Sequence, residues 1–231
     1  RDLHSFPTRR SSDLNLCTQR TIELVTASLR ESGVPDGLVS SLQRISMTAL
    51  KELMTHPNVN MISATGGPEV VAAALSSGKT TIGAGPGNPP VLVDETAHLE
   101  RAAIDIIAGC SFDNNLPCIA EKELIVVNCV ADELKKHLLA NGAFEVKEPA
   151  KIEALRKLVL TEENKVNKKW VGKCATEYLR EIGYEPGRQT RLVLVETDED
   201  HPFAQVELLM PILPMIRVPD FQKGQIGRAH V

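Results

Sequence analysis

Hydrophobic positions along the chain form two alternating patterns. Short continuous runs have the length of buried strands, and longer segments carry apolar side chains at helical spacing. The runs lie at 38–42, 59–63, 80–82, 91–94, 123–127, 191–196 and 212–218. The helical segments lie at 18–32, 46–54, 69–77, 96–109, 131–139, 150–159 and 170–182. Strands and helices in this order predict an α/β fold with a parallel sheet.

The sharpest change in composition is the glycine- and proline-rich stretch at 83–90, Gly-Ala-Gly-Pro-Gly-Asn-Pro-Pro. It predicts a seam between two domains, 15–85 and 86–221. The G-x-G-x-G spacing and the two prolines that follow do not fit a dinucleotide fingerprint, so a linker is favoured. The nearby Gly78-Lys79-Thr80 is not a phosphate-binding loop, because Ala73 occupies the position of the first required glycine.

Both ends of the sequence are foreign to this pattern. Residues 4–14 and 226–231 can be back-translated into stretches that resemble a pair of common sequencing adapters. We therefore expect 1–14 and 225–231 to be adapter-derived artefacts and the chain to be an internal fragment. A basic tail or a targeting peptide is the alternative for the N-terminal end, although no apolar segment follows Arg9 and Arg10 as a secretory signal requires.

Composition narrows the class of protein. The 231 residues are 42% hydrophobic, which is ample for a core, and no apolar run approaches the roughly 20 residues that span a bilayer. A net charge of -4 and 3% aromatic residues argue against nucleic-acid or anionic-membrane partners. The five cysteines form no C-x-x-C pair, which argues against a disulfide framework or a metal site and favours a cytoplasmic location.

One cysteine is placed where a nucleophile is needed. Cys118 follows the turn-rich run 111–117 and precedes the apolar run Glu123–Val127. A thiol just before a buried strand has a fixed scaffold and can still face a cleft, so the protein can control its reactivity. On placement alone, a lone cysteine is more often a small buried hydrophobic residue. We interpret Cys110, Cys129 and Cys174 as core or surface residues.

Two further segments have polar or glycine residues at the ends of elements. Thr65-Gly66-Gly67 ends a strand before a helix that Pro68 begins. This pattern fits either an ordinary helix start or a contact with a phosphate or nicotinamide group. His201 and Glu207 lie in a polar loop, where such residues are usually solvated or cap a helix.

Together these motifs resemble the aldehyde dehydrogenase superfamily. The Cys118 loop resembles the family's nucleophile loop, and Glu207-Leu208-Leu209-Met210-Pro211 resembles its glutamate motif at the nicotinamide ribose. The stretches 85–90 and 112–122 are similar to the CoA-acylating branch, the acetaldehyde and propionaldehyde dehydrogenases of ethanolamine and propanediol microcompartments. The order and spacing agree over about 15–221. The resemblance implies a three-layer sandwich, with a partial Rossmann-like cofactor domain before a truncated α/β catalytic domain.

The resemblance also implies an activity. A short-chain aldehyde, acetaldehyde or propionaldehyde, would react with CoA and NAD to give acyl-CoA and NADH through a thioester on Cys118. Thr65, Gly66, Gly67 and Glu207 would contact NAD. Hydrolytic members carry a general-base glutamate where this chain aligns Gly83, and its absence agrees with acyl transfer to CoA rather than to water.

The resemblance further implies a homo-oligomer at full length, contact with a microcompartment shell, and a location in the cytoplasm or inside a bacterial microcompartment. Three alternatives stay open: a non-acylating aldehyde dehydrogenase, the aldehyde dehydrogenase half of a bifunctional aldehyde–alcohol dehydrogenase, and an inactive remnant that serves in oligomerisation or as shell cargo. We expect the 231-residue fragment by itself to be inactive, because truncation exposes apolar surface that the whole protein would cover.

Overall fold

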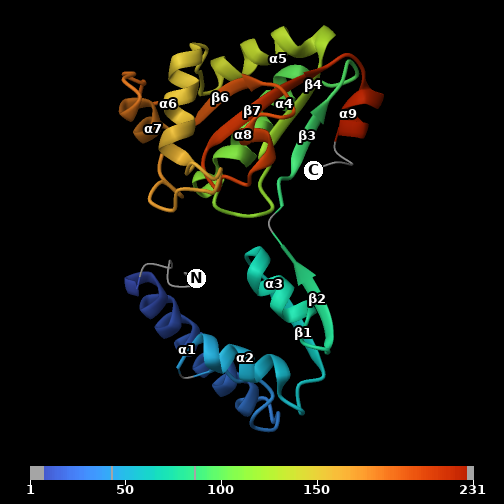
Figure 1. The fold of residues 1–231 in the computed structure, drawn as a ribbon, viewed down its shortest axis with the longest axis vertical. Coiled ribbons are helices and arrows are strands. Elements are labelled where there is room, and N and C mark those ends of the chain that lie inside the picture. The colour runs from blue at the N-terminus through green and yellow to red at the C-terminus, as the bar shows by residue number, and fades with distance from the viewer. Residues whose placement is uncertain (1–7, 43, 86, 228–231) are drawn as a thin grey trace. The chain divides into compact units, whose positions relative to one another are not determined.

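The chain divides into two units, residues 1–85 and 86–231. The computed structural model describes residues 8–42, 44–85 and 87–227 (Figure 1). The predicted artefacts at 1–7 and 228–231 lie outside the described residues, whereas 8–14 form part of helix α1 (Thr8–Glu31) and 225–227 part of helix α9 (Phe221–Gly227).

The first unit is built around one β-α-β element. Strands β1 (Met61–Thr65) and β2 (Thr80–Ala84) are parallel, with Met61 opposite Thr80, and helix α3 (Pro68–Leu75) connects them. Helices α1 and α2 (Met47–Thr55) precede this element, and α2 is capped by Ser46, whose Oγ accepts a hydrogen bond from the backbone N–H of Ala49 at 3.0 Å. The core of this unit is small, and β1 is buried at Ala64 only.

The second unit contains a five-stranded, fully parallel sheet in the order β3-β4-β7-β6-β5. Its strands are β3 (Pro90–Val93), β4 (Glu123–Val127), β5 (Ala143–Glu145), β6 (Leu192–Thr197) and β7 (Ile212–Val218). Its helices are α4 (Leu99–Ser111), the 3₁₀ helix η1 (Phe112–Asn115), α5 (Asn128–Ala140), α6 (Pro149–Val159), α7 (Ala175–Glu181), α8 (Pro202–Gln205) and α9. The predicted α/β fold with a parallel sheet is confirmed.

The order of the strands explains the three layers of this unit. The chain crosses the sheet from β3 through β4 to β5, and then returns through β6 to β7. Crossover connections between parallel strands are right-handed. When the chain reverses its direction across the sheet after β5, the connecting helices therefore lie on the opposite face of the sheet. Helices α4 and α5 pack on one face, against Leu124 and Leu194, while α6 and α7 pack on the other, against Val193 and Val195 (Figure 1).

Coverage on both faces explains why the strands are continuous apolar runs rather than alternating ones. All five residues of β4 are buried, and Leu124 and Val126 belong to one core cluster while Ile125 and Val127 belong to another. A strand between two helical layers has no solvent face on which polar side chains are favoured. Such runs can therefore be recognised in the sequence.

Two elements differ from the sequence prediction. Residues 38–42 contain a bend and irregular backbone instead of a strand. The predicted helix 170–182 begins only at Ala175, because Gly172 has a φ of 72° and interrupts it. Trp170 lies in the preceding loop, where its carbonyl oxygen accepts a hydrogen bond of 2.5 Å from the hydroxyl of Tyr178. Among the described residues, no helix is long and apolar enough to cross a membrane.

The connection from α5 to β5 gives a stability prediction. Gly142 has a φ of 108°, and a Cβ atom added there would lie 2.9 Å from the carbonyl oxygen of Gln189. Gly142→Ala should lower the free energy of unfolding of the chain by about 1–3 kcal/mol, because alanine is strained in this backbone conformation. Gly187→Ala is the matched control, since a Cβ there meets no atom within 4 Å. Equal stability of both variants in urea denaturation would contradict the prediction.

Candidate functional site

Three loops of the second unit meet at the amino ends of three adjacent strands. The stretch 87–89 leads into β3, the Cys118 loop 112–122 into β4, and the loop 206–211 into β7. The sheet order β3-β4-β7 places these strands side by side. Open α/β sheets usually bind ligands at the carboxyl ends of their strands, so this arrangement is at the opposite edge.

Hydrogen bonds join the three loops. The backbone N–H of Lys122 donates to the carbonyl oxygen of Pro89 at 2.7 Å. The Asn88 side-chain amide donates to the carbonyl oxygen of Ala204 at 2.8 Å and to the carboxylate of Glu123. The backbone N–H of Gly87 donates to the Glu207 carboxylate. The glycine- and proline-rich stretch is therefore part of the site as well as a linker.

The backbone of the Cys118 loop explains its unusual sequence. Asp113, Asn114 and Asn115 follow each other with φ values of 45°, 52° and 61°. Aspartate and asparagine tolerate this left-handed region better than other residues with a side chain, so the Asp-Asn-Asn run reverses the chain after α4. A turn closed by the Ala120 N–H and the Pro117 carbonyl oxygen follows, and Cys118 lies in this turn with an exposed side chain.

Asn115 fixes the loop from inside. Its side chain is buried, and its amide nitrogen donates to the carbonyl oxygens of Cys110 and Glu121, both at 2.9 Å. The first of these oxygens belongs to the last turn of α4, where helical carbonyl groups lack a partner within the helix. Asn115 therefore fastens the end of α4 to the segment that begins β4.

Lys122 completes this network and was missed by the sequence analysis. Its side chain is only 4% exposed, and Nζ donates to Asn115 Oδ1 at 2.6 Å and to the carbonyl oxygens of Asn115 and Pro117, both at 3.1 Å. Burial lowers the pKa of Lys122, and the negative charge of Glu207 opposes this shift. The sequence near Lys122 carries no clear signal of its burial, because its partners lie within the loop and the strand that follows begins with the charged residue Glu123.

The loop around Gly172 supports the site from another side. The Asn114 side-chain amide donates to the carbonyl oxygen of Gly172 at 3.0 Å, and the Gly172 N–H donates to the carbonyl oxygen of Leu209 at 3.2 Å. A Cβ at residue 172 would lie 3.1 Å from the side chain of Leu116. Gly172 thus connects the Cys118 loop to the loop that carries Glu207.

Glu207 is half-buried, and one of its oxygens has no hydrogen-bond partner. Oε1 is buried and unpaired. Burial raises the pKa of Glu207, while the Lys122 ammonium and the Gly87 N–H oppose the shift. A buried acceptor without a donor is costly, so Oε1 is suited to accept a hydrogen bond from a ligand hydroxyl. Glu207 is not the solvated residue that its loop position alone suggested.

Two other groups have structural roles. Cys110 is fully buried, and burial raises the pKa of its thiol, which keeps it protonated and unreactive. His201 is the N-cap of α8, where its ring nitrogen accepts a hydrogen bond from the backbone N–H of Phe203 at 3.1 Å. The capping interpretation of His201 is confirmed.

Thr65, Gly66 and Gly67 lie in the first unit. Thr65 ends β1, Gly66 donates its N–H to the carbonyl oxygen of Ala84 at 3.1 Å, and Gly67 is the N-cap of α3 with no side-chain cap. A Cβ at Gly67 would meet no atom within 4 Å, so the space beside this helix start is open.

A cavity lies between α2 and α3 in the first unit. It has a volume of about 740 Å³ and mainly apolar walls that include Met54 and Val70. Such a cavity can hold a flat, apolar part of a ligand. Gly83 faces α3, and a Cβ there would lie 2.9 Å from the Val71 side chain, so packing provides a second reason why no carboxylate occupies position 83.

The fold and the site define an α/β protein in which a loop with an exposed cysteine and a loop with a partly buried carboxylate enter the same edge of a parallel sheet. In the described part of the chain, no group of three histidine, cysteine, aspartate or glutamate residues is placed to hold a metal ion. The aldehyde dehydrogenase family profile matches residues 15–226, and the chain belongs to this family.

Comparison with individual proteins shows which members of the family the chain is similar to. The chain is 45% identical over 188 residues to a propanal dehydrogenase (CoA-propanoylating) of Salmonella typhimurium, a match that covers 81% of this chain and 40% of that protein. The structure of Rhodopseudomonas palustris propionaldehyde dehydrogenase with bound CoA and an acylated cysteine superposes with a TM-score of 0.83 and 46% identity, over 90% of this chain and 47% of that one.

A third relative comes from a microcompartment. The propionaldehyde dehydrogenase of the Clostridium phytofermentans fucose utilisation bacterial microcompartment is 40% identical, with a TM-score of 0.83 over 89% of this chain and 47% of that one. The chain therefore spans less than half the length of each of these three relatives.

The difference in burial between the two cysteines of this region can be tested with iodoacetamide. In the folded chain, Cys118 should be alkylated while Cys110 stays unmodified, because Cys110 is buried and its pKa is raised. In denaturant, both should react. Mass spectrometry of the proteolytic peptides measures each site separately. Alkylation of Cys110 as fast as that of Cys118 in the folded chain would contradict this description of the site.

Proposed function

We propose that the protein converts a short-chain aldehyde, acetaldehyde or propionaldehyde, with CoA and NAD into acyl-CoA and NADH, and that Cys118 carries the acyl group. The observation that carries the proposal is the position of Cys118: its exposed side chain lies on a loop fixed by buried hydrogen bonds from Asn115 and Lys122. The acylated cysteine of the Rhodopseudomonas palustris relative supports the same role.

In the proposed reaction, the Cys118 thiolate attacks the aldehyde carbon and forms a thiohemiacetal. The backbone N–H of Cys118 would stabilise the oxyanion, an interaction typically worth about 3 kcal/mol. NAD, when bound, supplies the hydride acceptor. Loss of the hydride leaves a thioester on Cys118, which the thiol of CoA attacks, so that acyl-CoA leaves and the Cys118 thiol is regenerated. Gly83 supports this final step, because no carboxylate at that position activates water against the thioester.

The residues present fit the cofactor. Glu207 Oε1 is a buried acceptor without a donor, which suits a ribose hydroxyl. The open space at Gly67 and the cavity between α2 and α3 suit the remainder of a dinucleotide. We therefore assign Thr65, Gly66, Gly67 and Glu207 to cofactor binding as part of the proposal.

The cellular location and the oligomeric state of the protein are also part of the proposal. The Clostridium phytofermentans relative comes from a bacterial microcompartment, which supports a location inside such a compartment. We propose that the full-length protein is a homo-oligomer there and contacts the shell. The acylating reaction is favoured over a non-acylating one by the Salmonella typhimurium and Rhodopseudomonas palustris relatives.

Replacement of the nucleophile tests the proposal directly. Cys118→Ala in the full-length protein should lower acyl-CoA formation more than about 1,000-fold, because no other group takes the place of the thiolate. Cys129→Ala is the matched control, since Cys129 is an exposed cysteine at the start of α5. The measurement is NADH formation with propionaldehyde and CoA. Retained turnover in Cys118→Ala would overturn the assignment, and turnover without CoA would favour the non-acylating alternative.

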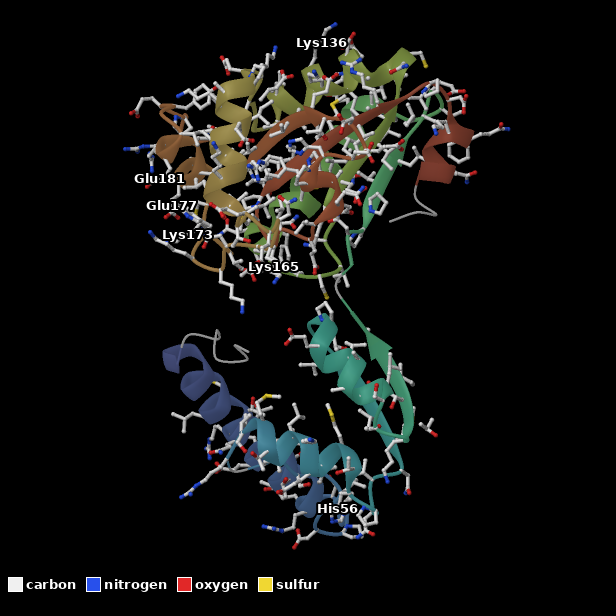
Figure 2. The ribbon with its side chains drawn as sticks, in the orientation of Figure 1. His56, Lys136, Lys165, Lys173, Glu177 and Glu181 are labelled. Atoms are coloured by element: carbon white, nitrogen blue, oxygen red, sulfur yellow. The ribbon has the colours of Figure 1, made fainter. Side chains whose placement is uncertain are left out.

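The assignment of Glu207 predicts a change in cofactor binding. Glu207→Gln keeps the shape of the side chain and removes its charge, so the KM for NAD should rise roughly tenfold, the loss of one charge-assisted hydrogen bond. Glu181→Gln is the control, because Glu181 is exposed on α7 (Figure 2). An unchanged KM for NAD in Glu207→Gln would remove Glu207 from the cofactor site.

A further inference from the structure

The buried ammonium of Lys122 has no obvious place in the proposed reaction, and its surroundings indicate what it does. An ammonium group has three N–H donors, and three oxygens lie within 3.1 Å of Nζ. All three belong to Asn115 and Pro117, the residues that precede Cys118 in the loop. Since these contacts occupy all three protons, Lys122 acts by position and charge rather than by proton transfer.

The contacts of Lys122 close the loop around the nucleophile. Lys122 lies at the end of the loop, immediately before β4, and reaches back across it to Asn115 and Pro117. Its backbone N–H is fixed to Pro89, and the residue after it begins a strand that is buried throughout. The three hydrogen bonds therefore fasten the turn that carries Cys118 to the rigid start of β4.

The charge of Lys122 also acts on Glu207. Burial raises the pKa of the Glu207 carboxyl group, and the Lys122 ammonium opposes this shift by favouring the charged form.

We propose that Lys122 is a positioning residue for Cys118: its buried ammonium closes the 112–122 loop through Asn115 and Pro117 and fixes the turn that carries the cysteine. The proposal rests on the assignment of Cys118 as the nucleophile.

Hydrogen exchange of the loop tests its closure. Lys122→Met should speed backbone amide exchange in residues 112–122 by roughly tenfold, because the loop loses the three hydrogen bonds that close it. Mass spectrometry of the proteolytic peptides measures the exchange of this segment. Lys136→Met is the matched control: Lys136 points into solvent from α5 (Figure 2) and its side chain is 73% exposed.

The outcomes separate the proposal from a purely structural role. If Lys122→Met folds, as measured by circular dichroism, and residues 112–122 exchange no faster than in the unaltered chain, the closing of the loop by Lys122 is overturned. Whether or not Lys122→Met folds, Lys122→Arg in the full-length protein tests the positioning of Cys118. That variant should lower kcat by about 100-fold at an unchanged KM for NAD, because arginine cannot reproduce the three contacts. An unaltered kcat would overturn the positioning role.

Failure of this proposal can be told apart from failure of the proposed function. Hydrogen exchange of residues 112–122 needs no aldehyde, NAD or CoA, so it reports on the Lys122 contacts alone. Turnover by the Cys118→Ala variant reports on the reaction alone. Faster exchange in Lys122→Met together with retained turnover in Cys118→Ala would therefore leave the Lys122 contacts standing and remove their catalytic purpose.

Discussion

The burial of one ammonium group is the interaction on which the site depends. Removing a charged lysine side chain from water is costly, and the cost is tolerated only where the charge and its donors find partners. Lys122 meets this condition with three oxygens of a single loop. The loop in turn could not hold three successive residues at positive φ without an internal partner that fixes them. The lysine and the loop therefore require each other.

The topology of the sheet determines where this pair can act. Strands β3, β4 and β7 are neighbours only because the chain crosses to β5 before it returns. Loops that are more than 80 residues apart in the sequence, such as those at Cys118 and Glu207, are thereby brought to one edge. Helices on both faces bury β4 throughout and most of β6 and β7, which gives the loops a rigid base. The site uses the amino edge because that is where these three loops enter the sheet.

The elements that were predictable are those whose signal is local. Buried strands such as Ile212–Val218 are apolar runs, and the Asp-Asn-Asn turn before Cys118 is recognisable by its residue types. The start of α7 was not predictable, because the apolar residues around Trp170 pack in the core but precede the helix. Lys122 was missed for a related reason: its partners are visible only once the loop has folded, and nothing in its immediate sequence separates it from a solvated lysine.

Glu207 illustrates how a tertiary contact changes the chemistry of a residue. In sequence it is a polar residue in a loop, and such residues are usually exposed. In the structure, burial favours its protonated form, while the ammonium of Lys122 and the N–H of Gly87 favour its charged form. The same ammonium holds the loop that carries Cys118 through Asn115 and Pro117. A single buried cation thus connects the Cys118 loop with the carboxylate proposed to hold the cofactor.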